Sequence, residues 1–314
     1  MAKEHAMIES GRRQSLGKRI WKNRWVYLFL LPGIAFVLLF CYGPMYGLVV
    51  AFKDYKISKG ILGSPWANPW YNNFAMMFKD KKFNAAFFNT IRMGLAYIIT
   101  GFPGPIILAL LLNEIRVKWF KRVTQTLLYL PHFLSWVVIG ATAYAMFATN
   151  SGVINTLIAN AGKSPIPFLQ EDAWWLFSYI LIGIWQTMGW GTIIYLAAIT
   201  NVNSELYEAA KVDGANRWQQ CLHVTLPCIR STIVVMLIMQ LGKLMGGSFE
   251  RIVALSNAKA TEYTTTIPVL VFKWFQGNKF SESTALGLFQ SVIGVILVVA
   301  SDKIAKKLGE DGLL

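Results

Sequence analysis

The sequence predicts an all-α, polytopic membrane protein with six transmembrane helices. Hydrophobic residues make up 55% of its 314 residues and charged residues only 15%, and the mean hydropathy is +0.44. A soluble domain of this length has a more charged composition. Long apolar runs recur along the chain, and about 20 apolar residues suffice for a helix to cross a hydrocarbon core of ~30 Å.

The first span begins after a basic segment and is too long for the apolar core of a signal peptide. Pro32 and Pro44 are expected to bend it, because proline removes a backbone donor and crowds the preceding turn. Trp174 and Trp175, at the start of the fourth span, are expected to anchor it at the outer interface. The six spans are predicted at 25–50, 86–112, 124–147, 174–200, 228–249 and 284–300.

The spans divide the chain into a basic tail (1–24), a six-helix domain (25–306) and a C-terminal tail (307–314). Lys and Arg are more numerous on the side of the membrane that holds the N-terminus. The positive-inside rule therefore puts both termini and the polar segment 201–227 in the cytoplasm, in a multi-pass protein of the cell membrane. Most of the cations behind the net charge of +14 lie at the ends of apolar runs, where anionic lipid attracts them, so no nucleic-acid partner is expected.

The segment 201–227 is a polar island between two apolar runs. Ser204 is expected to cap a short helix through Ala210. Gly214 is expected to break that helix, and a second short helix is predicted from Ala215 to Leu222. A new helix then begins near Pro227, since proline tolerates a first turn but not a helix interior.

The spacing within this island resembles the "EAA" loop of ABC-importer membrane permeases. In that family the loop is a cytoplasmic coupling helix that seats in a cleft of the ATP-hydrolysing subunit. The family pattern places an aromatic residue six before the proline, where this chain has Cys221. The alternative is an ordinary amphipathic linker between two spans. The residues that carry the resemblance, and are expected to couple to the ATPase, are Glu208, Ala209, Ala210, Asp213, Gly214, Ala215, Leu226 and Pro227.

Two further stretches, 130–136 and 246–250, resemble the carbohydrate-uptake branch of these permeases, the LplB type for oligosaccharides. The resemblance implies the ABC importer permease fold and a transport role. It also implies a second, related permease as heterodimer partner, two ABC ATPase subunits, and an extracellular solute-binding protein that delivers the oligosaccharide.

No catalytic or metal-binding pattern is found in the sequence. Gly162-Lys163-Ser164 matches only the end of a phosphate-binding loop, because Leu157 stands where its first glycine belongs. The chain is therefore not expected to be an enzyme, to need a cofactor or to bind a metal. ATP and Mg²⁺ are expected on the partner ATPase.

A polar stripe on span five is the predicted substrate path. Gln240, Lys243, Gly247 and Glu250 are spaced three, four and three residues apart, which places them on one helix face. An ionised side chain inside a span normally faces a watery cavity or a partner charge. Alternatively, Lys243 pairs with Glu250 or with the second permease. The aromatic residues expected to stack against sugar rings at similar depth are Trp136, Trp185 and Trp190.

Two other classes compete with the ABC permease. A secondary, ion-coupled transporter would need titratable groups within the membrane and usually repeated halves. A membrane-embedded enzyme would need a reactive constellation, for which His132 and Ser135 are too little. Neither class is favoured.

Overall fold

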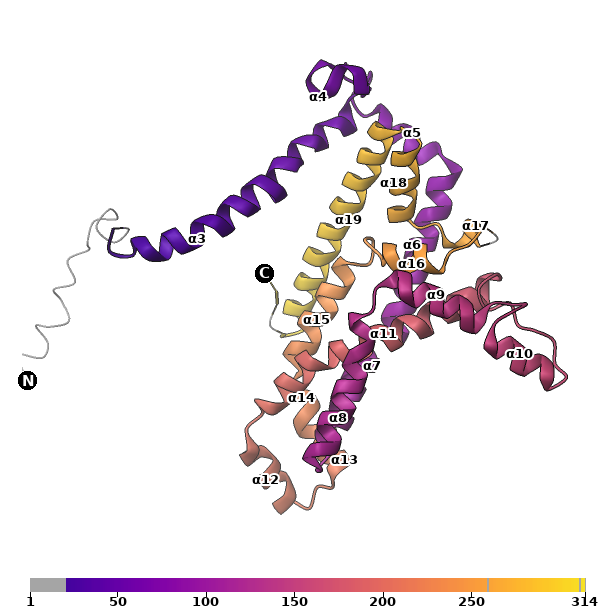
Figure 1. Ribbon diagram of the computed structural model, residues 1–314. Coiled ribbons are helices and arrows are strands. Elements are labelled where there is room, and N and C mark those ends of the chain that lie inside the picture. The colour runs from indigo at the N-terminus through magenta and orange to yellow at the C-terminus, as the bar shows by residue number, and fades with distance from the viewer. Residues whose placement is uncertain (1–20, 259, 311, 314) are drawn as a thin grey trace, which may run out of the picture.

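The computed structural model describes residues 21–258, 260–310 and 312–313, and it is built from helices (Figure 1). Across these residues, β-structure is limited to one isolated antiparallel bridge between Lys53 and Trp66. The all-α prediction is confirmed. Of the predicted basic tail, residues 1–20 lie outside the described part of the chain.

Four apolar segments form continuous helices of 28 to 34 residues. At a rise of about 1.5 Å per residue, even the shortest exceeds a hydrocarbon core of ~30 Å. Pro32 lies inside the first segment without ending it, and the backbone changes to π and then 3-10 geometry around Pro44. The segments are α3 (Arg24–Val37) with η1 (Leu38–Tyr42) and η2 (Gly43–Phe52); α6 (Lys81–Gly101) with α7 (Pro103–Glu114); α11 (Asp172–Thr200); and α19 (Phe280–Lys307).

The third predicted span is a bent pair rather than one helix. α8 (Lys118–Tyr129) and η4 (Leu130–Phe133) meet α9 (Trp136–Phe147) at 99°. Pro131 lies in η4, and Ser135 caps α9 by accepting a hydrogen bond from the Val138 amide at 3.4 Å. The predicted span 124–147 is therefore interrupted in its middle, because proline and a capping serine favour a restart there.

The fifth predicted span begins at a bend, and it ends early. α13 (Arg217–Gln220), η5 (Cys221–Thr225) and α14 (Leu226–Cys228) meet α15 (Arg230–Gly242) at 62°. α15 stops seven residues before the predicted end at 249, and Gly247 lies in the left-handed region with φ of +51°. Six spans are counted when each bent pair is taken as one.

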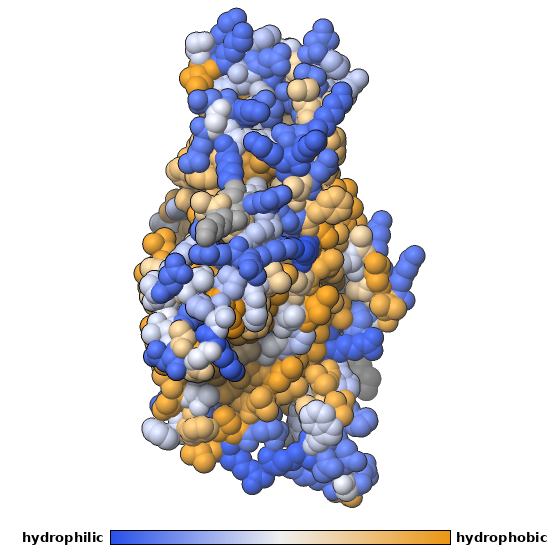
Figure 2. All heavy atoms as spheres, turned by 90° about the vertical axis from the view of Figure 1, so that its right-hand side faces the viewer, coloured by the Kyte–Doolittle hydropathy of each residue, from blue (hydrophilic) through white to orange (hydrophobic). Residues whose placement is uncertain are grey.

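Shorter helices cap the two ends of the molecule. Figure 1 shows α4 and α5 at one end and α12 and α13 at the opposite end. In Figure 2, hydrophilic residues lie at both ends of one face, and the hydrophobic residues between them surround a further hydrophilic area in the middle of the view. The shorter elements are η3 (Ile57–Lys59), α4 (Gly60–Gly63), α5 (Asn72–Lys79), α10 (Val153–Asn160), α12 (Ser204–Val212), α16 (Phe249–Leu255), α17 (Thr261–Thr264) and α18 (Ile267–Gln276).

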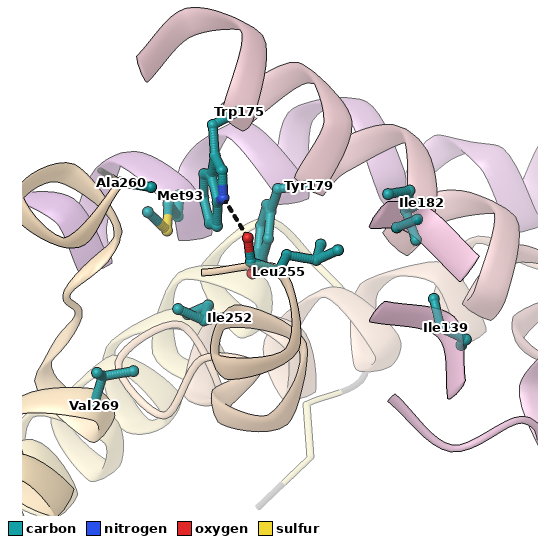
Figure 3. Packing of buried hydrophobic residues seen from close by; sticks show 10 residues of the cluster. Met93, Ile139, Trp175, Tyr179, Ile182, Ile252, Leu255, Ala260 and Val269 are labelled. Atoms are coloured by element: carbon teal, nitrogen blue, oxygen red, sulfur yellow. Dashed lines mark hydrogen bonds between the residues drawn. The ribbon is translucent and has the colours of Figure 1, made fainter. Parts of the chain in front are cut away.

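A buried cluster joins α11 to α16, α9 and α6 (Figure 3). At its centre the Trp175 indole Nε1 donates a hydrogen bond to the Leu255 carbonyl at 3.0 Å, and its ring stacks on Tyr179. Trp175 has 0% of its surface exposed. Its expected role as an interfacial anchor is therefore wrong: it packs in the core, and only its neighbour Trp174 is exposed.

The first helix behaves differently from the rest. In Figure 1, α3 extends away from the other helices, and none of its residues is buried within the chain. Its side chains are almost entirely apolar and exposed. The η2 segment, which follows α3 and η1, packs against α19 and α5.

Candidate functional site

The loop of the predicted coupling residues begins with α12. Its N-cap is Asn203, whose side-chain oxygen accepts a hydrogen bond from the Glu205 amide at 3.0 Å. Ser204 was expected in this role, but it is the first helical residue. Asparagine and serine are equally good caps, so sequence alone did not separate the two positions.

α12 ends in a closed backbone motif at Gly214. The Ala215 amide donates to the Ala210 carbonyl at 2.8 Å, and the Gly214 amide donates to Lys211 at 3.0 Å. This pair of bonds defines a Schellman motif, which needs a left-handed residue after the helix. Gly214 supplies it with φ of +79°. The predicted break after Asp213 is confirmed.

The second short helix starts two residues later than expected. Asn216 and Gln219 form a reciprocal capping box, with bonds of 3.0 and 2.8 Å between each side chain and the other residue's amide. α13 therefore begins at Arg217 rather than Ala215, because the capping box fixes the start. An ion pair of 2.6 Å between Arg217 and Glu114 ties this helix to the end of α7.

The loop exposes a mixed surface at the end of the molecule. Glu208 and Ala209 are exposed and Ala210 is partly buried. Two apolar side chains project beside them, Val212 with 88% and Trp218 with 69% of their surface exposed. Exposed apolar side chains that lie together are typical of a docking surface.

The end of the loop connects to the bundle. Pro227 lies in the first turn of α14, as predicted, and Leu226 packs against a cluster that includes Tyr195 and Ile229. Cys221, which replaces the aromatic residue of the family pattern, is partly buried. The Tyr207 and Thr225 hydroxyls lie 3.0 Å apart and join α12 to η5.

A cavity of about 400 Å³ lies between the spans. It is lined by residues of α6, α7, η4, α9, α11, α15 and the start of α16. Five of the predicted path residues line it: Trp136, Trp190, Gln240, Lys243 and Gly247.

The other two predicted path residues do not line this cavity. Trp185 has 51% of its surface exposed outside it, and Glu250 is exposed in the first turn of α16. The predicted continuous stripe is wrong because α15 ends at Gly242, with Lys243 as its C-cap. Gln240, Lys243 and Gly247 nevertheless meet at the cavity, since the chain turns around it.

Arg251 is a cavity residue that the sequence pattern did not reveal. It follows the predicted end of the fifth span at 249, but it has only 3% of its surface exposed. Its guanidinium carbon lies 4.2 Å from the ring centre of Tyr179 and 4.4 Å from that of Tyr97. No spacing of residues in the sequence identifies Arg251 as a cavity residue, because the side chains that it contacts come from α6 and α11.

The remaining polar lining combines flat rings with amide and hydroxyl groups. His132 stacks on Trp190, with ring centres 4.6 Å apart and planes within 7°. The Tyr97 and Thr187 hydroxyls lie 2.6 Å apart. The lining holds two cations, Lys243 and Arg251, and, among the described residues, no Asp or Glu. The cavity therefore has aromatic faces, hydrogen-bonding groups and a positive charge.

The model of the binding-protein-dependent transport system inner membrane components matches residues 101–308, about two thirds of the chain. This chain belongs to that family. The coupling-loop sequence and the helical architecture agree with that membership.

Two curated relatives match over nearly their whole length. The polygalacturonan/rhamnogalacturonan transport system permease protein YteP of Bacillus subtilis (strain 168) is 41% identical, over 99% of this chain and 97% of its own. Protein LplB of the same organism is 38% identical, over 98% and 96%.

A solved structure also matches over nearly the whole chain. It is a chain in the crystal structure of a bacterial alginate ABC transporter in complex with an alginate pentasaccharide-bound periplasmic protein. It is 34% identical, with a TM-score of 0.86, over 96% of this chain and 100% of that one. The protein is thus a membrane permease of an ABC importer, and the ion-coupled alternative is set aside.

Proposed function

We propose that this permease forms half of the translocation path for an oligosaccharide that an extracellular solute-binding protein delivers. The cavity is the observation that carries the proposal. Trp136 and Trp190 offer flat faces to the apolar faces of sugar rings, and Gln240 and Lys243 donate hydrogen bonds to hydroxyls. The sugar transport named for YteP and the alginate transporter supports the same substrate class.

The α12–α13 loop seats in a cleft of a separate ATPase in this proposal. Two copies of that ATPase bind ATP and Mg²⁺, while this chain transmits the motion and does no chemistry. Glu208 pairs with a cation of the ATPase, and the small Ala209 and Ala210 allow close approach. The exposed Val212 and Trp218 support this assignment, since water is a poor environment for both side chains.

A second, related permease completes the path as a heterodimer partner. The apolar surface of α3, none of which is buried within the chain, suits a position against lipid and that partner. The proposed coupling places the α12–α13 end in the cytoplasm, together with both termini.

Reconstitution tests this function. The chain, its second permease, the ATPase and the binding protein are placed in proteoliposomes, and uptake of labelled oligosaccharides is measured with ATP inside. Uptake that requires both ATP and the binding protein is expected. Uptake driven by an ion gradient without ATP, or no uptake of any oligosaccharide, would overturn the proposal.

A further inference from the structure

Arg251 is a buried cation in the cavity whose hydrogen-bonding capacity is largely unused. Its Nη2 donates to the Ser248 hydroxyl at 2.6 Å. Its Nε and Nη1 atoms are buried and have no hydrogen-bond partner among the described residues. An arginine stays protonated in proteins, so two charged donor positions are left open.

No acidic side chain of the described residues neutralises Arg251. Arg92, the arginine within span two, pairs with Asp172 through two bonds of 2.5 and 2.6 Å. Arg251 takes part in no such ion pair, and its sequence neighbour Glu250 is exposed. A buried charge without a counterion is costly, and the site is completed when an anion enters.

Aromatic rings and a glycine shape the space around the guanidinium. Tyr97, Tyr179 and Trp136 present their ring faces to it, which lessens the cost of burial without supplying a negative charge. At Gly183 of α11, a Cβ atom would overlap Arg251 Nη1 and lie 2.9 Å from Cζ. Any larger residue there would displace the guanidinium from its position.

We propose that Arg251 binds a carboxylate of the transported sugar, so that the substrate is an oligosaccharide containing uronic acid units. A carboxylate accepts a charge-assisted hydrogen bond from a guanidinium N–H, which is stronger than the bond that a neutral hydroxyl accepts. Lys243 adds a second positive charge to a lining without acidic residues. This inference rests on the proposed function.

The test compares trigalacturonate with its methyl ester, which has the same rings without the charge. Binding of each labelled sugar is measured on the assembled transporter in nanodiscs, without the solute-binding protein, so that only the permease cavity discriminates. Wild type is expected to bind the acid at least about 30-fold more tightly than the ester, as for a buried hydrogen-bonded charge pair.

Three variants locate that preference. Arg251→Met is expected to remove the preference and leave ester binding unchanged. Gly183→Ala is expected to weaken acid binding in the same direction, because the added methyl group displaces the guanidinium. Arg230→Met removes an exposed arginine outside the cavity and is expected to bind both sugars like wild type.

Several results would overturn the inference. Equal binding of acid and ester by wild type would do so, as would an unchanged preference in Arg251→Met. If the Arg251→Met transporter fails to assemble, the Gly183→Ala transporter takes its place in the test. An unchanged preference for the acid in that variant would also overturn the inference. A wild-type transporter that binds neutral oligosaccharides but shows no acid preference refutes this inference alone. Binding of no oligosaccharide at all refutes the proposed function.

Discussion

The α12–α13 loop, which we propose couples to the ATPase, and the cavity hold their side chains in different ways. In the loop, the bonds that set the end of α12 and the start of α13 join residues fewer than six positions apart, as in the Schellman motif at Gly214 and the capping box of Asn216 and Gln219. In the cavity, Arg251 rests against Tyr97 and Tyr179, which lie on two other helices. The loop therefore depends on local backbone geometry, and the cavity depends on how distant helices pack.

This difference predicts different kinds of sensitivity. A loop variant should uncouple ATP hydrolysis from transport while sugar binding stays intact. A cavity variant should change sugar binding while basal ATP hydrolysis stays intact. The following experiments sharpen or break that separation.

The largest effect is expected for Gly214→Val. A β-branched residue at φ of +79° is strained, and left-handed backbone costs ~1–2 kcal/mol even for ordinary residues, so the Schellman motif opens. Binding-protein-stimulated ATP hydrolysis should fall about tenfold or more. Gly162→Val is the matched control, since Gly162 has a similar φ of +75° in a loop after α10. Equal coupling in the two variants would show that the motif is not needed.

Charge reversal at Glu208 should have the next largest effect. Glu208→Lys replaces the exposed carboxylate proposed to pair with the ATPase, and we expect stimulated hydrolysis to fall about tenfold. Glu208→Gln keeps the size of the side chain and removes only its charge, so its stimulated ATP hydrolysis should fall less than that of Glu208→Lys. The idea fails if both variants hydrolyse ATP and transport sugar like wild type at equal membrane levels.

A smaller effect, measured as sugar binding by the assembled transporter, separates Trp190 from Trp185. Trp190 lines the cavity and stacks on His132, whereas Trp185 lies outside it. Trp190→Ala should weaken sugar binding about threefold to tenfold through the lost ring contact. Trp185→Ala should bind sugar like wild type. If Trp185→Ala weakened sugar binding more than Trp190→Ala, the sugar path would lie along the other face of α11.

The smallest effect is expected for Lys243→Met. This side chain is exposed and lies directly after the last residue of α15, so water and salt screen its charge. Uptake should fall about twofold to fivefold, the range of an exposed charge contact, with assembly and basal ATP hydrolysis retained. Unchanged uptake and unchanged substrate preference would remove Lys243 from the path.

The sequence predicted those features that short-range rules determine. Gly214 and Pro227 act where they were expected, because a left-handed turn and a first helical turn each have a strong residue preference. Six apolar runs were recognised from length and composition. The interruption of the third span before Ser135 and the early end of the fifth span at Gly242 were missed, since an apolar run looks the same whether its helix is straight or interrupted.

The roles of some residues could be identified only from the tertiary structure. Arg251 lies beyond the predicted end of the fifth span, and Trp175 was expected to be an interfacial anchor. Burial by distant helices leaves no periodic signal for either residue. Glu250 was assigned to the stripe on the assumption of one helix through 228–249, and the break after Gly242 removed it. Within the membrane, a residue's neighbours decide its role more than its spacing does.

Cross-linking at α12 tests most directly the claim that this loop couples the permease to a separate ATPase. In a background with Cys41, Cys221 and Cys228 changed to Ser, a photoactivatable cross-linker is attached to Ala209→Cys, which is exposed on the loop. In the assembled transporter, light should join this chain to the ATPase. The same probe at Asn160→Cys, at the end of α10, should not. An Ala209 probe that never captures the ATPase, or captures it no better than the Asn160 probe, would contradict the account.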